Sequence, residues 1–371
     1  MRIAIISTQF AINYGAVLQA IALRKAINNL GYECEILDFH PINNVDGTKT
    51  VYKFNNIKRI IYSLLLFVNF VFRKENQKKI LRFNEFVERN GGLSKNKYHS
   101  YKDLKDKLPQ YDVFICGSDQ IWNLNLFDDL SFFLKFEDKY PKSKFIAYAP
   151  SITEKLKTVQ LKKIIKNISH FTSISVREKS GANQLSDYLG YKVKNVLDPV
   201  FLLSIEQWIS LEEPLEINES YILNYGLVGS KNTVKLVNKA KKRFDIKVVN
   251  INIDPFNKFN ADYNLTNLSP GNFIWLFRNA DFIISSSFHG MVFSIVFQKQ
   301  FLTTPASYRC SRHKNVLEIL NLENRILDDN DNLDNKLSMD SIDYNQVNIS
   351  LNKARNESLE YLKNSINKSG K

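Results

Sequence analysis

Short apolar segments alternate with amphipathic helical segments along most of this chain, and this alternation limits the fold more than any other feature. Residues 3–7 and 34–39 are apolar runs of strand length, and residues 16–30 between them carry apolar side chains at helical spacing. This order predicts a βαβ unit with parallel strands. The same alternation returns from residue 113 and again from residue 221. The sequence therefore predicts an α/β fold of two Rossmann-like, doubly wound domains that face a cleft.

The interruptions of this pattern give the predicted domain organisation. We predict an N-terminal Rossmann-like domain over 1–205 that carries a helical insertion at about 44–108. A C-terminal Rossmann-like domain follows over 206–330, and a loop with a C-terminal helix completes the chain over 331–371. Ligands of such sheets bind beyond the carboxyl ends of the strands. Polar clusters directly after predicted strands are therefore the candidate site residues.

The composition limits the classes of partner and site. The 371-residue chain has 51 lysines and arginines against 38 aspartates and glutamates, a formal charge of +13. A phosphorylated substrate and a solvated lysine-rich surface both account for this charge. No zinc-finger or RNA-recognition motif accompanies it, so we predict no nucleic-acid partner. The cysteines (Cys34, Cys116 and Cys310) form no CxxC pair, so we expect neither a disulfide framework nor a metal site.

The start of the chain and its apolar runs bear on location. The segment MRIAIIST is typical of a first strand and not of a signal peptide. No apolar run reaches the roughly 18 residues of a membrane-spanning helix. We therefore predict a cytoplasmic protein. Residues 60–72 are apolar with basic flanks, which fits peripheral contact with the inner face of a membrane; a buried helix of the first domain is the alternative.

The first polar cluster follows the first predicted strand. Asn13, Tyr14 and Gly15 stand where a helix begins, and Gln19 lies about one turn further on. Small residues at a helix N-terminus allow backbone N–H groups to approach an anion. A helix cap with a tight turn is the alternative interpretation.

The second cluster is the segment GSDQIWN at 117–123. Ser118, Asp119, Gln120 and Asn123 offer hydroxyl, carboxylate and amide groups beside the indole of Trp122. Such groups suit sugar binding, with the indole stacked on a pyranose face. An Asx-type turn with the tryptophan anchored in the core is equally compatible.

Two further clusters carry a cation or a histidine. Arg177 leaves a predicted strand and can bind a carboxylate or phosphate through its planar fork, or it forms a surface ion pair with Glu178. The segment SSSFHG at 285–290 lies between an apolar strand and an apolar helix, where N–H groups, hydroxyls and His289 can converge on one anion. His40, which follows a strand and precedes a proline, is the second choice among the histidines.

Four segments in order resemble the signature segments of the polysaccharide pyruvyl transferase family. They are NYGAVLQA, DVFICGSDQIWN, LDPVFLL and ADFIISSSFHGMVFSIVFQKQF, and the resemblance spans about 1–325. It implies a fold similar to the GT-B glycosyltransferases, phosphoenolpyruvate as donor, a sugar diol as acceptor and a ketal-linked pyruvate as product. The acceptor would be an intermediate of a surface polysaccharide, capsule or exopolysaccharide, in a lipid-linked form. The N-terminal domain would then be the acceptor side of the cleft and the C-terminal domain the donor side.

The resemblance implies that His289 and Arg177 contact the donor. We predict His289 as general acid or phosphate stabiliser, and Asp119 as the group that orients or deprotonates the acceptor hydroxyl. The predicted donor-binding residues are Arg177, Ser286, Ser287, Phe288, Gly290 and Arg312, and the predicted acceptor-binding residues are Asn13, Tyr14, Gly15, Gln19, Ser118, Gln120, Trp122 and Asn123. We expect no cofactor and no metal, because protonation and anion stabilisation supply the activation.

Two other functions compete with this one. A nucleotide-sugar glycosyltransferase of the GT-B type would need a ribose-binding carboxylate in the C-terminal domain, and no clear glutamate for it follows Gly290. A non-catalytic, glycan-binding member of the family would have lost its key polar residues, and the segments NYGA, GSDQ and SFHG are all present.

Overall fold

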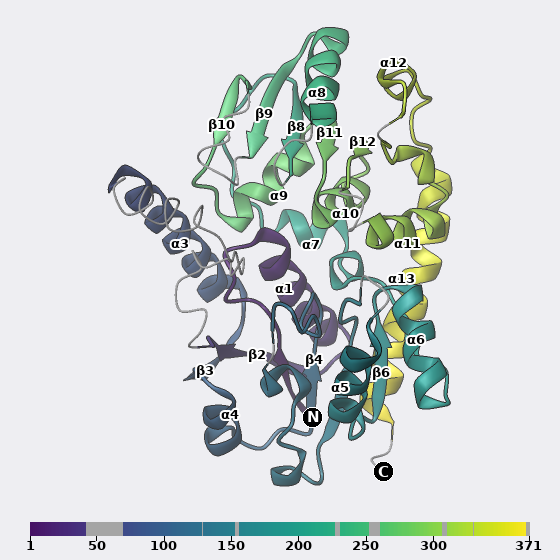
Figure 1. Cartoon of the computed structure of the whole chain (residues 1–371). Helices are drawn as coiled ribbons and strands as arrows, with labels where there is room; N and C mark the ends of the chain where they lie inside the picture. Colours follow the sequence, from purple (N-terminus) through teal and green to yellow (C-terminus); the bar gives the residue numbers. More distant parts are fainter. Residues whose placement is uncertain are drawn as a thin grey trace.

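Two parallel sheets form the centre of the protein (Figure 1). The computed structural model describes residues 1–41, 70–127, 129–152, 156–226, 231–251, 260–305, 310–328 and 330–368. The first sheet has seven strands in the order β3-β2-β1-β4-β5-β6-β7, and the second has five in the order β10-β9-β8-β11-β12. The predicted α/β fold of two parallel sheets is confirmed.

The seven-stranded sheet belongs to the N-terminal part of the chain. Its strands are β1 (Arg2–Ile6), β2 (Glu33–Phe39), β3 (Leu93–Tyr98), β4 (Val113–Cys116), β5 (Lys144–Ala147), β6 (Ser173–Val176) and β7 (Lys194–Asn195). The helices around it are α1 (Tyr14–Asn29), α3 (Phe70–Asn90), α4 (Tyr101–Lys107), α5 (Thr158–Ile168) and α6 (Lys179–Leu189). Every residue of β4 is buried, which is why this strand is a continuous apolar run and not an alternating one.

The predicted helical insertion is wrong in one respect, because it also contains a strand. Residues 70–90 form α3, but β3 follows and pairs in parallel with β2 at the edge of the sheet. An edge strand needs little apolar surface, so the polar sequence LSKNKY gave no strand signal. Of the apolar segment 60–72, residues 60–69 lie outside the described residues and 70–72 begin α3.

The five-stranded sheet belongs to the C-terminal part. Its strands are β8 (Tyr221–Tyr225), β9 (Lys247–Ile251), β10 (Tyr263–Leu265), β11 (Phe282–Ser285) and β12 (Gln300–Thr303). The helices of this part are α7 (Ile205–Ile209), α8 (Lys231–Phe244), α9 (Pro270–Asn279), α10 (Phe288–Val296), α11 (Cys310–Leu320) and α12 (Leu333–Leu337). Helix α12 lies where the sequence predicted only a loop; its start is capped by the side chain of Asn332.

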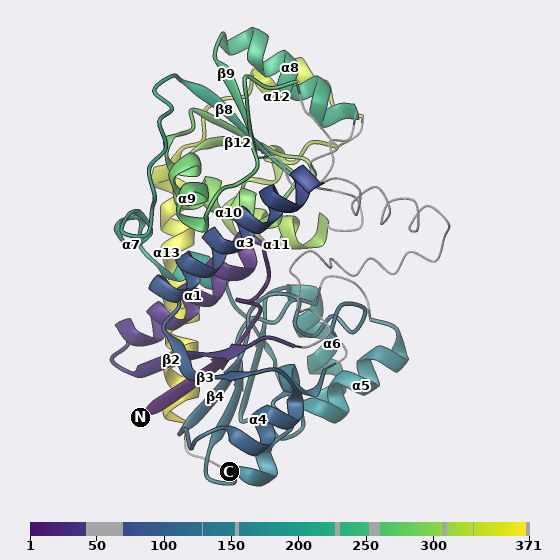
Figure 2. The ribbon, with the colours of Figure 1, turned by 90° about the vertical axis from the view of Figure 1, so that its left-hand side faces the viewer.

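The C-terminal helix α13 (Tyr344–Asn367) runs from the second sheet back along the first (Figures 1 and 2). The hydroxyl of Ser358 accepts a hydrogen bond from the backbone N–H of Leu197 at 3.0 Å. The ammonium of Lys144 donates to the carbonyl of Ile366 at 2.6 Å. These contacts fix the C-terminal helix on the N-terminal domain.

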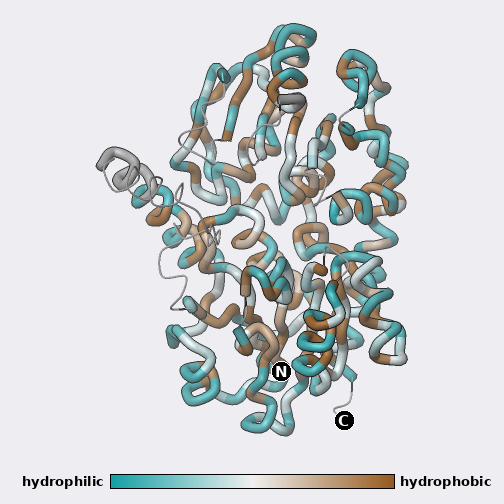
Figure 3. The backbone as a smooth tube through the Cα atoms, in the orientation of Figure 1, coloured by the Kyte–Doolittle hydropathy of each residue, from teal (hydrophilic) through white to brown (hydrophobic). Residues whose placement is uncertain are grey.

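One hydrophobic cluster extends through both domains. It contains Ile5 and Val17 of the first domain, Phe273 and Met291 of the second, and Leu362 of α13, all buried. Hydrophobic residues concentrate on the strands and on the adjacent helices (Figure 3). The shared core places the carboxyl ends of β6 and β7 opposite α10 of the other domain.

Candidate functional site

Three charged or titratable side chains from both domains meet at one carboxylate oxygen. Arg177 follows β6, Asp198 follows β7, and His289 lies in the first turn of α10. The Oδ2 atom of Asp198 lies 2.5 Å from Nη1 of Arg177 and 3.5 Å from Nε2 of His289. Arg177 is 2% exposed and Asp198 is fully buried. The predicted donor residues therefore lie between the domains, and not on the C-terminal domain alone.

The turn before α10 is built by close approaches of backbone and side chain. The side chain of Ser287 caps the helix by accepting from the N–H of Gly290, and Ser285 donates from its hydroxyl to the carbonyl of Tyr225 at 2.6 Å. A Cβ atom on Gly290 would lie 2.0 Å from Oγ of Ser285. Position 290 thus requires glycine, because only glycine lets the helix start this close to its own strand.

Gly15 in the first turn of α1 also makes room for a neighbour, in this case the ring of His289. A Cβ atom on Gly15 would lie 2.0 Å from Nδ1 of the His289 ring. The first turn of α1 therefore packs directly against the imidazole. This contact explains why glycine occupies the position after Tyr14 and connects the first polar cluster to the fourth.

The guanidinium of Arg177 is held by three carboxylates and one ring. Besides its contact with Asp198, its Nε lies 3.4 Å from Oε1 of Glu178 and its Nη2 lies 4.0 Å from Oδ1 of Asp119. Its Cζ lies 4.5 Å from the centre of the Phe288 ring. Burial by itself lowers the pKa of Arg177, but the three carboxylates raise it above its ordinary value. The arginine is therefore a permanent cation.

Each of these carboxylates also accepts hydrogen bonds from groups other than arginine. Glu178 accepts from the hydroxyl of Ser151 and from the N–H of Ile152, both at 2.7 Å. Asp198 accepts from the N–H of Val200 at 3.0 Å. Burial by itself raises the pKa of Asp198, yet His289 and Arg177 more than offset this effect and the pKa lies below its usual range. Asp198 is thus ionised at neutral pH.

Two nitrogen atoms of the cluster have no hydrogen bond within the described part of the chain. They are Nη2 of Arg177 and Nε2 of His289, and both are buried. The 3.5 Å contact of His289 with Asp198 is of ion-pair length but lacks the alignment of a hydrogen bond. A buried polar group without a partner costs about 1–3 kcal/mol. Two such nitrogens on side chains that share the Asp198 carboxylate indicate a site for a ligand with hydrogen-bonding groups.

The other predicted donor residues lie around this pair. Ser286 and Ser287 are half-buried at the mouth of the turn. Arg312 in α11 is buried, and its Cζ lies 5.6 Å from the centre of the Phe288 ring. The structure therefore brings the predicted donor group together around Phe288 and His289.

The predicted acceptor residues of the first cluster make contacts within the protein; Tyr14 and Gln19 are buried, whereas Asn13 is exposed. Asn13 caps α1 by accepting from the N–H of Ala16 at 3.2 Å. The ring of Tyr14 stacks on Phe273 of the other domain at 4.6 Å between centroids. Gln19 is buried and donates to Oγ of Ser7 at 2.8 Å. These side chains hold the loop and the two domains together.

Trp122 of the second cluster takes the alternative that the sequence left open, that of a core residue. It is 1% exposed, donates from Nε1 to the carbonyl of Phe132 at 3.2 Å, and stacks on Phe133. Because the indole ring is buried, it is not available in this conformation for the suggested stacking on a sugar. Ser118 is likewise buried and donates to the carbonyl of Ala149.

Asp119, Gln120 and Asn123 remain partly exposed in the same segment. Gln120 and Asn123 hydrogen-bond to each other at 3.1 Å, and the Asp119 carboxylate accepts from Thr8 at 3.3 Å. These three side chains are the part of the second cluster that a ligand can reach.

Sequence reasoning missed Asp198 as a site residue. It caps the short 3₁₀ helix η4 (Pro199–Leu202), and a helix cap is the ordinary role of an aspartate before proline. The available signal was its position directly after a strand, the same criterion that selected Arg177 and His289.

No group of three or more metal-ligating side chains occurs among the described residues, and no helix within them is long and apolar enough to cross a membrane.

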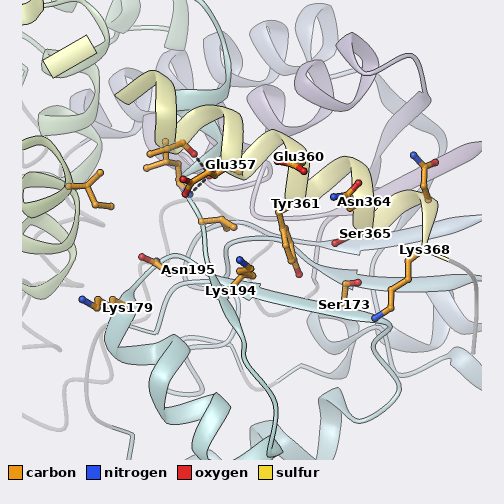
Figure 4. Close-up of a pocket in the computed structure, with 16 residues that line it drawn as sticks. Ser173, Lys179, Lys194, Asn195, Glu357, Glu360, Tyr361, Asn364, Ser365 and Lys368 are labelled. Carbon is orange, nitrogen blue, oxygen red and sulfur yellow. Dashed lines mark hydrogen bonds between the residues drawn. The ribbon is translucent and has the colours of Figure 1, made fainter. Parts of the chain in front are cut away.

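A groove with a volume of about 920 Å³ lies between α13 and β7 (Figure 4). Lys194, Glu360, Tyr361 and Asn364 line it, and none of the predicted site residues does. The groove is therefore separate from the candidate site.

The two sheets and the site between them define the class of protein: a two-domain fold of the GT-B type. The UDP-GlcNAc 2-epimerase from Methanocaldococcus jannaschii has a TM-score of 0.52 at 13% identity, over 96% of this chain and 94% of that one. The UDP-GlcNAc 2-epimerase from Neisseria meningitidis bound to UDP-GlcNAc gives 0.49 at 10% identity, over 99% and 98%. The model of the family "Polysaccharide pyruvyl transferase" matches residues 13–305. The chain therefore belongs to the polysaccharide pyruvyl transferase family, as the resemblance predicted.

Family membership gives the general class of activity, a transferase of polysaccharide biosynthesis. No curated protein matches the chain in sequence.

Proposed function

We propose that this protein transfers pyruvate from phosphoenolpyruvate to two hydroxyls of a sugar in a surface-polysaccharide intermediate, with release of phosphate. The observation that carries the proposal is a pair of buried nitrogens, Nη2 of Arg177 and Nε2 of His289, that have no hydrogen bond among the described residues. The two side chains come from opposite domains, and Asp198 links them, because its Oδ2 contacts Nη1 of Arg177 and Nε2 of His289. Phosphoenolpyruvate carries a phosphate and a carboxylate, and both need fixed N–H donors and positive charge.

Arg177 is the proposed anchor for the donor. Its guanidinium cannot lose its proton, is held in place by Asp198 and Glu178, and retains Nη2 for a ligand oxygen. Ser286 and Ser287 add hydroxyls at the N-terminus of α10, where a helix favours an anion. Arg312 adds a second cation, with its Cζ 5.6 Å from the centre of the Phe288 ring.

His289 is the proposed proton donor. Protonation of the methylene carbon of phosphoenolpyruvate converts it to a methyl group and leaves C2 with oxocarbenium character. One sugar hydroxyl attacks C2, and the bond from C2 to the phosphate oxygen breaks. The second hydroxyl closes the ketal. The proton of one hydroxyl replaces the one taken from His289, and the other leaves with the phosphate, so the reaction balances without a cofactor or a metal.

Asp119 is the proposed group on the acceptor side. Its side chain is 16% exposed and one oxygen lies 4.0 Å from Nη2 of Arg177, so it borders the proposed donor position. A carboxylate there suits orientation or deprotonation of an acceptor hydroxyl. The acceptor in this proposal is lipid-linked and is met at the cytoplasmic membrane face.

Phosphate release tests the proposal. The full-length protein is incubated with phosphoenolpyruvate and lipid-linked or oligosaccharide acceptors, and the product is checked by mass for the added pyruvate. His289→Ala should reduce turnover by about 10²-fold or more if the imidazole transfers the proton. His99→Ala, an exposed histidine, is the control and should turn over like the wild type.

Two results would contradict the proposal. Turnover of His289→Ala close to that of the wild type removes the histidine from the chemistry. Release of a nucleoside diphosphate from a nucleotide sugar, with no phosphate released from phosphoenolpyruvate, would instead establish the glycosyltransferase alternative.

A further inference from the structure

We propose that Asp198 is a positioning residue of this site, which orients the imidazole of His289 and the guanidinium of Arg177 relative to each other across the domain boundary. The inference rests on the proposed function, because it concerns the site for the donor. It adds a residue that lies outside the polar clusters selected from the sequence.

The carboxylate of Asp198 is itself held in one orientation. Its Oδ1 accepts from the N–H of Val200 at 3.0 Å, which leaves Oδ2 for the two cationic or N–H-bearing groups. The preceding residue, Leu197, donates from its N–H to Ser358 at 3.0 Å and accepts at its carbonyl from Tyr148 at 3.2 Å. Helix α13 and the end of β5 thereby fix the backbone that carries Asp198.

The imidazole of His289 lies between Asp198 and Gly15. Its Nε2 faces the carboxylate, and its Nδ1 faces the position where Gly15 has no Cβ. A carboxylate opposite Nε2 favours the tautomer that carries the proton on Nε2. Because the contact is 3.5 Å long and is not a hydrogen bond, this proton is oriented but still available to a ligand. This arrangement suits a hydrogen bond from Nε2 to an oxygen of the donor, and the same N–H carries the transferred proton when the ring is an imidazolium.

A purely structural role for Asp198, as counter-charge to Arg177, makes a different prediction. Removal of the charge would then lower stability and leave the tautomer of His289 and the turnover per folded molecule unchanged. Asp198→Asn separates the two roles. The amide still accepts from Val200 through its oxygen, but it presents an NH₂ group to both Arg177 and His289.

The primary measurement is the ¹⁵N spectrum of the histidine rings in the full-length protein. The chain has 5 histidines, and the signals of His289 are identified by their absence in His289→Gln. We expect the wild type to show the proton on Nε2, and Asp198→Asn to shift toward the Nδ1-protonated form. In the phosphate-release assay, we expect kcat to fall by about 10²-fold, with a smaller change in KM for phosphoenolpyruvate. A misoriented imidazole weakens the stabilisation of the transition state more than the binding of the ground state.

Glu178→Gln is the matched control. It also removes a buried carboxylate from beside Arg177, but this side chain contacts Ser151 and Ile152 and not His289. The tautomer of His289 should therefore remain that of the wild type. A change equal to that in Asp198→Asn would overturn the assignment, because charge alone would then explain both.

The ¹⁵N spectrum of the histidine rings also tests the inference in two cases in which phosphate release gives no information. If Asp198→Asn does not fold, a wild-type spectrum with the proton on Nδ1 still overturns the inference. If the wild type releases no phosphate from phosphoenolpyruvate, the proposed function fails, while the tautomer and its change in Asp198→Asn continue to test the role of Asp198.

Discussion

Two polar clusters of the N-terminal sheet differ in how their buried hydrogen-bonding groups are used. The cluster after β4 is internally complete: the N–H of Ser118 donates to Gln19, the Ser118 hydroxyl donates to Ala149, and the indole of Trp122 donates to Phe132. The cluster after β6 is incomplete, because Nη2 of Arg177 and its neighbour Nε2 of His289 have no hydrogen bond among the described residues.

The difference separates a structural motif from a candidate site. Buried polar groups in folded proteins are nearly always hydrogen-bonded, so a complete cluster explains itself as a means of holding backbone. An incomplete cluster needs another explanation, and two such nitrogens on side chains of different domains that share one carboxylate suggest a ligand. Sequence composition does not distinguish the two clusters, since both are polar segments after buried strands.

The largest expected effect is that of Gly15→Ala on the incomplete cluster. The new Cβ would lie 2.0 Å from Nδ1 of His289, so the ring must move away from Gly15 and lose its present orientation relative to Asp198. A displacement of about 1 Å in a catalytic group can cost about 10²-fold in rate. We expect phosphate release to fall by about that factor, measured as kcat with saturating phosphoenolpyruvate.

A double-mutant cycle shows whether the effect passes through the ring. In the His289→Ala background the clash disappears, so Gly15→Ala should have little further effect on the residual rate. Additive losses would mean that Gly15 acts on something other than His289, and the contact between α1 and α10 would lose its functional interpretation.

The second prediction concerns the complete cluster. Gln19→Met retains the volume of the side chain but leaves the N–H of Ser118 without an acceptor. We expect the free energy of unfolding to fall by about 1–3 kcal/mol, measured by urea denaturation, with KM for the acceptor unchanged. Gln120→Met is the matched control in the same cluster; its side chain is partly exposed, so its effect should stay below about 0.5 kcal/mol.

A result of the opposite kind would contradict the structural role of the complete cluster. If Gln19→Met raised KM for the acceptor and left the urea midpoint unchanged, the first two clusters would regain the acceptor-binding role that the sequence suggested for them.

The fold was predictable because its signal is periodic and repeated. Buried parallel strands such as β4 and amphipathic helices leave patterns that do not depend on any single residue. The edge strand β3 and the short helix α12 escaped prediction for physical reasons. An edge strand with lysine and asparagine side chains lacks apolar alternation, and a helix of five residues depends on its cap more than on its face.

The site was predictable only in part, because position along a strand is visible in the sequence and side-chain direction is not. His289 and Arg177 were selected by their place after buried strands, and the structure brings them together at Asp198. Trp122 met the same criterion, yet its ring turns inward onto Phe133. Asp198 was missed because its second role, the cap of a 3₁₀ helix, already accounts for its identity.

The prediction with the smallest expected effect concerns His170, another histidine whose buried ring nitrogens have no hydrogen bond among the described residues. His170 also lacks hydrogen-bond partners for both ring nitrogens among the described residues, yet it lies against Phe145 and Phe171, before the start of β6 and not beyond its end. Burial lowers its pKa to about 4, against a smaller opposing effect of Glu137. A buried ring without hydrogen bonds is tolerated here, 3.8 Å from the Glu137 carboxylate, because a neutral ring between aromatic side chains costs less than a buried charge.

The sign of the pH dependence follows from this lowered pKa. The unfolded chain binds a proton at His170 below about pH 6.5, whereas the folded protein does so only near 4, so stability is complete above 6.5 and is lost as the pH falls through this window. We expect the wild type to lose about 1–2 kcal/mol more than His170→Gln between pH 7.5 and pH 5.0, measured by urea unfolding. Equal losses in both proteins would mean that His170 is protonated in the folded state. The Glu137 carboxylate, 3.8 Å from Nδ1, would then offset the burial of the charged ring. The lack of hydrogen bonds at His289 and at His170 would in that case no longer separate a ligand site from the core.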